Sequence, residues 1–340
     1  SQTYRYVKFL TNGHNGTLST TINRYINVGV HNFTDGYKIT LNNASDFAVG
    51  DIIGIQIHNS WYSCDDSQTY TAVKALQNPD TYLHTPNTHA TITAITNNTL
   101  TLDKPVNWGY LEGGETVVKI NRNFKVEGYI SKDGAGLWQK PYFRCASGTA
   151  TPKVYWMTNT YFENVGSSRL STSNWNRGID FYQQDYNNPA IFDGCTFELY
   201  NGSAANGLTF QSGIGIVRNC YIANMYEYRP SYNASYCGVA TYNNKINNIF
   251  RPYLENFRNG MFNYNEVAGT YQSWIVEGIG YDINTTNNAS EIRRNSFHGV
   301  RDVPGVYSTG YGAAGGVTPI IRSEYNRVYA ANSVAYTHRP

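Results

Sequence analysis

The sequence predicts an all-β solenoid, because an Asn-centred pattern recurs along the chain and the composition favours strands and turns. The pattern reads apolar-x-x-Asn, with Gly in one copy, followed by a small or apolar residue and usually another apolar residue. Its copies begin 25 to 39 residues apart, a period typical of solenoids. They lie at Ile120–Val126, Trp156–Phe162, Ile191–Phe197 and Ile216–Ile222, with looser copies at Tyr253–Phe257 and Ile292–Phe297.

Each copy is interpreted as one side of a coil: a short strand, a corner at Asn or Gly, and a second short strand. Asn and Gly tolerate the left-handed backbone that such a corner requires. The same residue types are also common in unrelated β-turns, so an antiparallel sandwich over residues 120–297 is the alternative.

The composition supports a β-rich core and excludes two classes of partner. Hydrophobic residues make up 41% of the 340 residues, whereas charged residues make up only 15%, against roughly 25% in ordinary soluble domains. The formal net charge is +2 and no Lys/Arg cluster is present, so no nucleic-acid partner is expected. No apolar run reaches membrane-spanning length, so no membrane insertion is expected.

The chain divides into four expected regions. Residues 1–45 form a β-rich N-terminal segment that can be read as the end of an upstream domain. Residues 46–116 form a β-rich cap region that contains a hairpin with an Asn-Asn turn. Residues 117–300 form the solenoid. The glycine-rich residues 301–340 form a C-terminal cap or an oligomer contact, since open solenoid ends must be covered.

Long insertions between the strands are the expected binding surface, because solenoid insertions often carry function. They span residues 131–152, 166–177, 227–236 and 284–290. Exposed aromatic rings can pack on sugar rings, while Asn, Asp and Arg side chains bond to hydroxyl groups. The alternative is that such aromatic residues only cover the solenoid wall. The candidate carbohydrate-binding residues are Trp175, Arg177, Tyr182, Tyr226, Tyr228, Tyr232 and Trp274.

The repeats resemble the right-handed parallel β-helix that phage tail fibres and tailspikes share with many polysaccharide-processing proteins. Residues 46–166 are similar to the β-helical part of secreted hyaluronan-degrading proteins of the cell-migration-inducing type, through Val49–Ile53, Leu100–Pro105, Ile120–Val126 and Phe162–Gly166. That family carries a histidine-rich strand shortly afterwards, where this chain has Gly178–Gln183 without histidine. The resemblance implies the fold, a homo-oligomer (a trimer) and other virion tail proteins as partners.

Catalysis on a glycan would need charged groups that the coils bring together. Glycoside hydrolysis requires two carboxyl groups about 5–5.5 Å apart for retention or about 6.5–9.5 Å apart for inversion. Stacked coils could bring Asp180, Asp193 and Glu198 to such distances, although solvated or corner-capping carboxylates are the simpler interpretation. A lyase would need a cation that holds an acidic sugar, and Arg177 beside Asp180, or the pair Arg293 and Arg294, are the candidates. No catalytic residue is assigned.

No cofactor and no metal site are expected. His84 and His89 lack a third ligand at metal-binding spacing, and the five cysteines form no CxxC motif. Cys195 and Cys220 occupy the same place in consecutive repeats, so they are expected to stack as buried thiols.

These observations predict a structural and receptor-binding β-helical protein of a virion tail fibre or tailspike, directed at a cell-surface polysaccharide or other glycan. Its expected location is the virion tail or the extracellular space. One alternative is a polysaccharide depolymerase, a hydrolase or lyase on the same fold. A second alternative is a secreted structural protein of a cell surface or filament, since eight Asn-x-Ser/Thr sequons are present.

Overall fold

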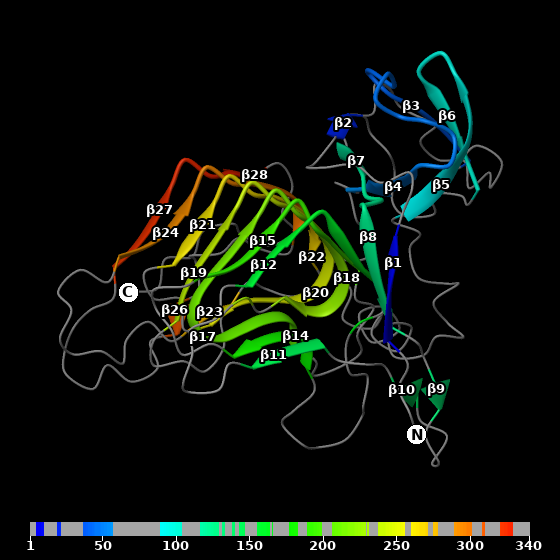
Figure 1. The fold of residues 1–340 in the computed structure, drawn as a ribbon. Coiled ribbons are helices and arrows are strands. Elements are labelled where there is room, and N and C mark those ends of the chain that lie inside the picture. The colour runs from blue at the N-terminus through cyan, green and yellow to red at the C-terminus, as the bar shows by residue number, and fades with distance from the viewer. Residues whose placement is uncertain are drawn as a thin grey trace, which may run out of the picture.

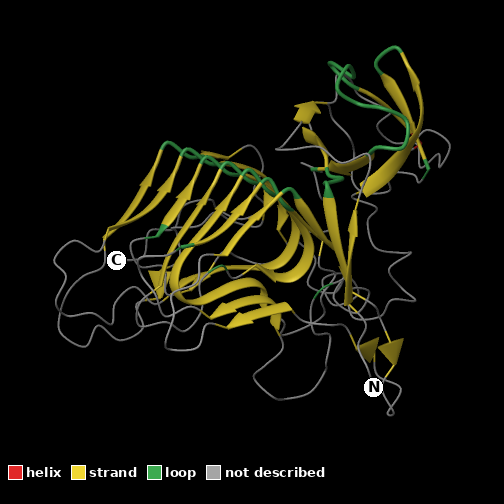
Figure 2. Ribbon diagram, viewed as in Figure 1, coloured by secondary structure: helices red, strands yellow, loops and turns green. Residues whose placement is uncertain are grey.

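The computed structural model describes a chain built from strands, and no α-helix occurs in its described residues (Figures 1 and 2). The described residues are 5–9, 19–21, 37–56, 89–103, 116–128, 131–132, 138–139, 143–146, 155–163, 165, 177–182, 189–198, 206–228, 230, 237–255, 260–270, 275–277, 289–300, 308–309 and 320–328.

The largest unit is a parallel β-helix whose coils stack through three sheets, called here faces A, B and C (Figure 1). Face A contains β8 (Phe124–Gly128), β13 (Thr160–Glu163), β16 (Thr196–Glu198), β18 (Tyr221–Tyr228), the first half of β20 (Lys245–Glu255), β22 (Glu266–Thr270), β25 (Ser296–Val300) and β28 (Arg327–Val328). Face B contains β12 (Tyr155–Thr158), β15 (Ala190–Asp193), the second half of β17 (Asn206–Arg218), β19 (Cys237–Tyr242), β21 (Met261–Asn263), β24 (Ala289–Arg293) and β27 (Ile320–Glu324).

Face C closes each coil. It contains β11 (Phe143–Ala146), β14 (Arg177–Tyr182), the first half of β17, the ends of β18 and β20, β23 (Ile275–Glu277) and β26 (Ser308–Thr309). On all three faces the strands of successive coils pair in parallel. The predicted fold class, an all-β parallel β-helix, is therefore confirmed.

A residue with left-handed backbone turns each coil from face B to face A. Their φ angles lie between 50° and 63°. Such a turn is easiest for Gly and Asn, which explains why the predicted corners are correct at Asn159, Gly194 and Asn219. The full series is Asn159, Gly194, Asn219, Asn243, Tyr264, Arg294 and Tyr325.

The repeat pattern fails at several corners: it does not contain the corner at Asn243, and Asn123 of its first copy is not left-handed. It misses the corners at Tyr264 and Tyr325, because tyrosine is rare in left-handed backbone. The copy that starts at Tyr253 lies in β20 on face C rather than before a corner. In the copy that starts at Ile292, the left-handed residue is Arg294 and the following Asn295 is buried.

Behind the corners, Asn side chains that are buried, or partly buried in the last coil, form a hydrogen-bonded ladder. Asn244, Asn265, Asn295 and Asn326 each follow the left-handed residue of their coil. The Oδ1 of Asn265 accepts the backbone N–H of Asn244 at 3.0 Å, and its Nδ2 donates to the carbonyl of Thr241 at 3.1 Å. The next rung repeats the pattern, since Asn265 N–H donates to Asn295 Oδ1 at 2.8 Å. Successive rungs are 21 to 31 residues apart, so coil length varies while the corner stays in register.

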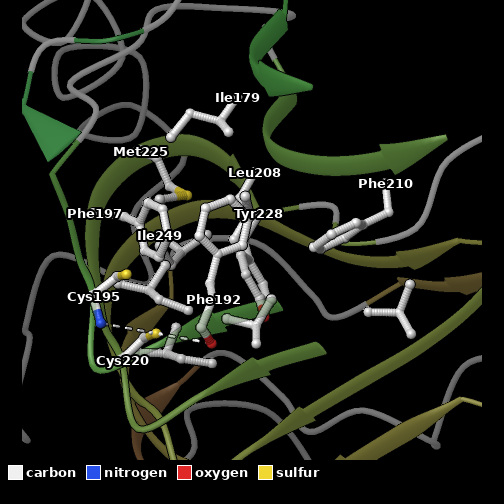
Figure 3. Close-up of a cluster of buried hydrophobic side chains, with 14 of the residues drawn as sticks. Ile179, Phe192, Cys195, Phe197, Leu208, Phe210, Cys220, Met225, Tyr228 and Ile249 are labelled. Atoms are coloured by element: carbon white, nitrogen blue, oxygen red, sulfur yellow. Dashed lines mark hydrogen bonds between the residues drawn. The ribbon is translucent and has the colours of Figure 1, made fainter. Parts of the chain in front are cut away.

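Side chains that alternate with the outward residues fill the interior of the coils (Figure 3). Phe162 and Phe197 stack with ring centroids 5.1 Å apart, and Phe192 meets Phe197 edge to face at 5.2 Å. The prediction for Cys195 and Cys220 is confirmed: both thiols are buried and free, and the N–H of Cys195 donates to Cys220 Sγ at 3.4 Å. These coils are therefore filled by a packed core.

An antiparallel sheet of six strands, called here the N-terminal sheet, precedes the solenoid in the order β2–β7–β4–β5–β6–β3. Its strands are β2 (Ser19–Thr21), β3 (Lys38–Thr40), β4 (Ile52–Ile55), β5 (His89–Thr96), β6 (Thr99–Leu102) and β7 (Thr116–Lys119). Strands β5 and β6 form the predicted hairpin, with Asn97 left-handed at the turn. Separately, β1 (Arg5–Phe9) pairs with β8, and β9 (Ser131–Lys132) pairs with β10 (Trp138–Gln139), both antiparallel.

The observed regions differ from the predicted ones in three ways. Strands β2 and β3 precede residue 46 but share a sheet with the cap region. Strand β11, inside the predicted insertion 131–152, is a coil strand, and β18 reaches into the predicted insertion 227–236. Strands β26, β27 and β28 continue the three faces past residue 300. Most of the insertions predicted at 166–177 and 284–290, and the glycine-rich run 310–316, lie outside the described residues.

Candidate functional site

The N-terminal sheet covers the outer surface of face A at β16, β18, β20 and β22. Val118 of β7 and the adjacent Ile120 pack against Tyr221 and Ala223 of β18. The backbone approaches closely as well, since a Cβ at Gly54 would lie only 2.5 Å from Cζ of Tyr221. Glycine at this position therefore allows the sheet to lie directly on the coil.

Hydrogen bonds link the N-terminal sheet to face A at this junction. Gln56 Nε2 donates to the carbonyls of Ile246 and Glu266, both at 3.1 Å. In the opposite direction, Asn247 Nδ2 donates to the carbonyl of Ile55 at 2.9 Å. These groups are engaged in holding the two units together, so they are not available to a ligand.

The junction also contains a fully buried carboxylate, Glu198 of β16. Tyr161 Oη and Asn224 Nδ2 donate to it, the latter at 2.9 Å, and His89 Nδ1 of the N-terminal sheet lies 3.4 Å from its Oε1. Burial alone would raise the pKa of Glu198, but the charge and hydrogen bond of His89, with the bonds from Tyr161 and Asn224, lower it below its ordinary value of 4.5. Glu198 is an ionised structural group that a polysaccharide cannot reach.

Glu163 lies at the same register as Glu198 on the preceding coil, and sequence reasoning missed this pair. Tyr161 Oη donates to Glu198 and lies 3.4 Å from Glu163 Oε1. Neighbouring strands lie about 4.8 Å apart, close to the spacing of a retaining glycosidase. The signal in the sequence is a Glu after the Phe of two consecutive repeats, Phe162-Glu163 and Phe197-Glu198. The N-terminal sheet covers Glu198 of this pair through His89, and Glu163 forms an ion pair with Lys125 of β8.

The three carboxylates considered for hydrolysis lie on different faces. Asp180 lies in β14 on face C, Asp193 in β15 on face B, and Glu198 in β16 on face A. Asp193 accepts hydrogen bonds from Arg218 Nε at 2.9 Å and from Asn219 Nδ2 at 2.8 Å. Stacking aligns residues at one register of successive coils, so it does not bring these three residues together on neighbouring coils of one face.

The outer surface of face B is open along an apolar column. Trp156, Ile191, Ile216 and Met261 share one register of this face. Trp156 is 62% exposed and Met261 is 37% exposed, while Ile191 and Ile216 are partly exposed between them. The column therefore offers a flat apolar strip that crosses several coils.

A polar column runs beside the apolar one on face B, two residues further along each strand. Arg218 Nη2 lies 2.8 Å from Asp193 Oδ2, and Arg218 Nη1 donates to Tyr242 Oη at 3.2 Å. The hydrogen bonds to Tyr242 and Asp193 raise the pKa of Arg218 above its usual range. Face B thus combines an apolar strip with a fixed row of hydrogen-bonding groups.

The structure changes the set of aromatic candidates. Tyr228 is fully buried in the core, where its hydroxyl lies 3.5 Å from Thr241 Oγ1 and burial raises its pKa (Figure 3). Tyr228 does not face a sugar, because the predicted insertion begins later than expected and this residue still belongs to the coil. Arg177 and Tyr182 lie in β14 and Tyr226 in β18, but their side chains are not described. Trp175, Tyr232 and Trp274 lie outside the described residues.

Sequence reasoning missed the exposed aromatic residues Trp156, Tyr264 and Tyr325. Trp156 occupies the first apolar position of its repeat, and strand alternation before the corner places that position outward. Counting back three residues from each corner would have identified it as an exposed site.

Among the described residues, no three His, Cys, Asp or Glu side chains are grouped so that they could hold a metal ion. His89 contacts Glu198, and His84 lies outside the described residues. The ranges that the structure describes contain no helix with the length and apolarity needed to cross a membrane.

The three stacked faces define the chain as a parallel β-helix protein. No known family model and no curated protein matches it. Among solved structures it is similar to the tailspike gp61 of Pseudomonas phage phi297, with 11% identity, a TM-score of 0.27, and coverage of 92% of this chain and 57% of that chain. It is also similar to the gp54 tailspike of Acinetobacter baumannii bacteriophage AP22, solved with A. baumannii capsular saccharide, with 11% identity, a TM-score of 0.21, and coverage of 95% and 57%. The chain thus spans 57% of the length of each tailspike.

Proposed function

We propose that this chain is a structural, receptor-directed part of a virion tail fibre or tailspike, and that it binds a cell-surface glycan on the open surface of face B. The observation that carries the proposal is the apolar column headed by Trp156, which lies beside the Asp193–Arg218–Tyr242 row. Sugar rings pack their apolar faces on indole, and their hydroxyl groups bond to carboxylate, guanidinium and phenol groups.

The repeating geometry suits a polymer. Equivalent residues on neighbouring coils are about 4.8 Å apart, so each column offers similar contacts at regular intervals along the solenoid. An extended glycan laid along face B would meet apolar and polar groups together, whereas face A offers no comparable surface beneath the N-terminal sheet.

The test is binding to a panel of bacterial capsule and lipopolysaccharide glycans. We expect Trp156→Ala to weaken binding about tenfold, the effect of losing roughly 1.4 kcal/mol at an aromatic contact. Tyr37→Ala, which removes an exposed ring before β3, is the matched control and should bind like the wild type. Failure of the wild type to bind any glycan, or equal binding by both variants and the wild type, would refute the proposal.

The same panel separates binding from depolymerase activity. Reducing ends are measured after incubation with the wild type, Asp180→Asn and Asp193→Asn. We expect binding without release of reducing ends. Release that is lost in one variant would replace the binding function with glycan cleavage and would locate its site.

A tail fibre or tailspike would also be a homo-oligomer, which we propose is a trimer held in the virion tail with other tail proteins. Sedimentation equilibrium of the chain measures this directly. A trimer mass is expected, and a monomer at all concentrations would contradict this part of the proposal.

A further inference from the structure

The corner between faces B and A carries an exposed ridge in its last coils, defined here as Tyr264, Arg294 and Tyr325. These residues occupy the left-handed position of three successive coils, with φ angles of 58°, 55° and 58°. Tyr264 and Tyr325 are 53% and 76% exposed, and Arg294 is exposed between them. The ridge is therefore a surface feature that continues over three coils.

The backbone does not explain why these three residues are Tyr, Arg and Tyr. The earlier corners use Asn or Gly, the residues that tolerate left-handed φ. Other L-residues pay about 1–2 kcal/mol for this conformation. Three successive corners therefore carry side chains that make the left-handed conformation less favourable than it would be with Asn or Gly. Local backbone strain of this kind is common at functional sites.

The charge of Arg294 is held in place by aromatic rings rather than by an acid. Its guanidinium carbon lies 5.6 Å from the centre of the Tyr264 ring and 5.8 Å from that of Tyr325. Its Nη1 donates to Tyr264 Oη at 2.9 Å. Among the described residues no carboxylate forms an ion pair with Arg294. Its guanidinium has five N–H donors, so several are left for a ligand.

The neighbouring Arg293 shows the contrast. It lies on face B, where Glu291 and Glu324 form ion pairs with it at 3.5 and 3.4 Å. The two adjacent arginines therefore have different roles: Arg293 is paired with carboxylates of its own coil and the next one, and Arg294 presents its charge at the surface.

We propose that the ridge is a subsite for an acidic sugar residue, whose carboxylate or sulfate group pairs with Arg294 while its ring lies against Tyr264 or Tyr325. A guanidinium binds such an anion through two parallel hydrogen bonds, which a lysine ammonium does not reproduce. The two tyrosines lie two coils apart, about 9.6 Å along the stack, which leaves space for one sugar unit over Arg294. This inference rests on the proposed glycan-binding function and narrows it to an anionic glycan.

The test compares acidic capsular oligosaccharides with the same oligosaccharides after chemical reduction of their carboxyl groups, and with dextran sulfate as a source of sulfate. We expect Arg294→Gln to weaken binding of the acidic forms about tenfold or more, and Arg294→Lys to restore only part of it. Binding of the carboxyl-reduced forms should change by less than about twofold in every variant. Loss on dextran sulfate but not on uronic acids would assign the site to sulfated glycans.

The matched control is Arg327→Gln, which removes an exposed arginine of the last described coil on face A. An equal loss in this control, or no loss in Arg294→Gln, would overturn the inference. If Trp156→Ala still weakens binding while Arg294→Gln does not, only the ridge subsite fails. If the wild type binds no glycan in either form, both proposals fail. A changed oligomer mass in Arg294→Gln would instead make the ridge a contact between copies of this chain.

Discussion

Faces A and B are built from the same coils and meet at the same corner, yet the middle strands of face A are covered and face B is open. On face A the outward residues Tyr221 and Asn247 contact the N-terminal sheet. On face B the outward residues Trp156 and Met261 contact solvent. The backbone of both faces is the same parallel ladder, so the difference lies in their outward side chains and in where the N-terminal sheet packs.

The largest effect on stability is expected from the Asn ladder, which lies at the corner that faces A and B share. Asn265→Ala removes the acceptor of Asn244 N–H and the donor to the carbonyl of Thr241, and it leaves both buried groups without these partners. Each such loss costs about 1–3 kcal/mol, so we expect a fall of about 3–5 kcal/mol in the free energy of unfolding, measured by urea denaturation.

Asn243→Gly provides the control for the ladder at an exposed left-handed position of the same corner. Its side chain bonds only to Asn219 in the described structure, and glycine tolerates φ of 55°. A change of less than about 0.5 kcal/mol is expected. If both variants lost the same stability, the ladder would not be the shared support of the two faces.

The second largest effect on stability is expected at the contact between the N-terminal sheet and face A, which has no counterpart on face B. Gly54→Ala places a Cβ 2.5 Å from the buried Tyr221 ring, and such overpacking costs about 1–3 kcal/mol. The urea midpoint should fall accordingly. Adding Tyr221→Leu should recover part of the loss, because the conflicting atoms belong to the end of the ring. Full stability of Gly54→Ala would mean that the sheet does not lie against face A.

A smaller change in stability is expected when the pH is lowered, and we expect it to arise from Glu198 on face A. The pKa of Glu198 is lowered in the folded chain, so its stabilising contribution is present above the unfolded value of 4.5 and is lost as pH falls below it. Urea midpoints measured from pH 7 to pH 3 should therefore decline at the acid end.

Glu198→Gln tests whether this carboxylate causes the decline. It should cost about 1 kcal/mol at pH 7 and should flatten the loss of stability below pH 4.5. An unchanged pH profile in the variant would assign the acid sensitivity to other carboxylates.

The smallest effect on stability is expected on the open face. Trp156→Ala truncates a residue that is 62% exposed, and surface substitutions usually change stability by less than about 0.5 kcal/mol. The same variant is expected to weaken glycan binding, so a thermal melt and a binding assay on one protein separate the two roles. A loss of several kcal/mol would instead make Trp156 a structural residue.

Much of the solenoid can be predicted from the sequence because its corners impose a local backbone requirement. Asn159, Gly194 and Asn219 are visible as left-handed residues between apolar strands. The corners at Tyr264 and Tyr325 are not, because their side chains violate the rule that makes corners recognisable. The sequence therefore does not reveal the corners at Tyr264 and Tyr325, where the local backbone preference of the residue conflicts with the fold.

The candidate site is less predictable, because it depends on which face another unit covers. Glu198 and Asp193 look alike in sequence, five residues apart on either side of a corner. The contact of His89 with Glu198 joins residues that are far apart in the chain, and no local pattern encodes it. Tyr228 similarly looks like a loop aromatic until the pairing of β18 and β20 places it in the core.

The ladder also bears on how such a chain can diversify. The Asn residues of the ladder stay aligned from coil to coil, although the coils between them differ by as much as ten residues in length, from 21 to 31. Segments between face C and face B can thus be lengthened, shortened or exchanged one coil at a time, because the rungs reset the alignment at every turn. For a protein engineer, this means that a recognition loop can be grafted into one coil of the β-helix without redesigning the neighbouring coils.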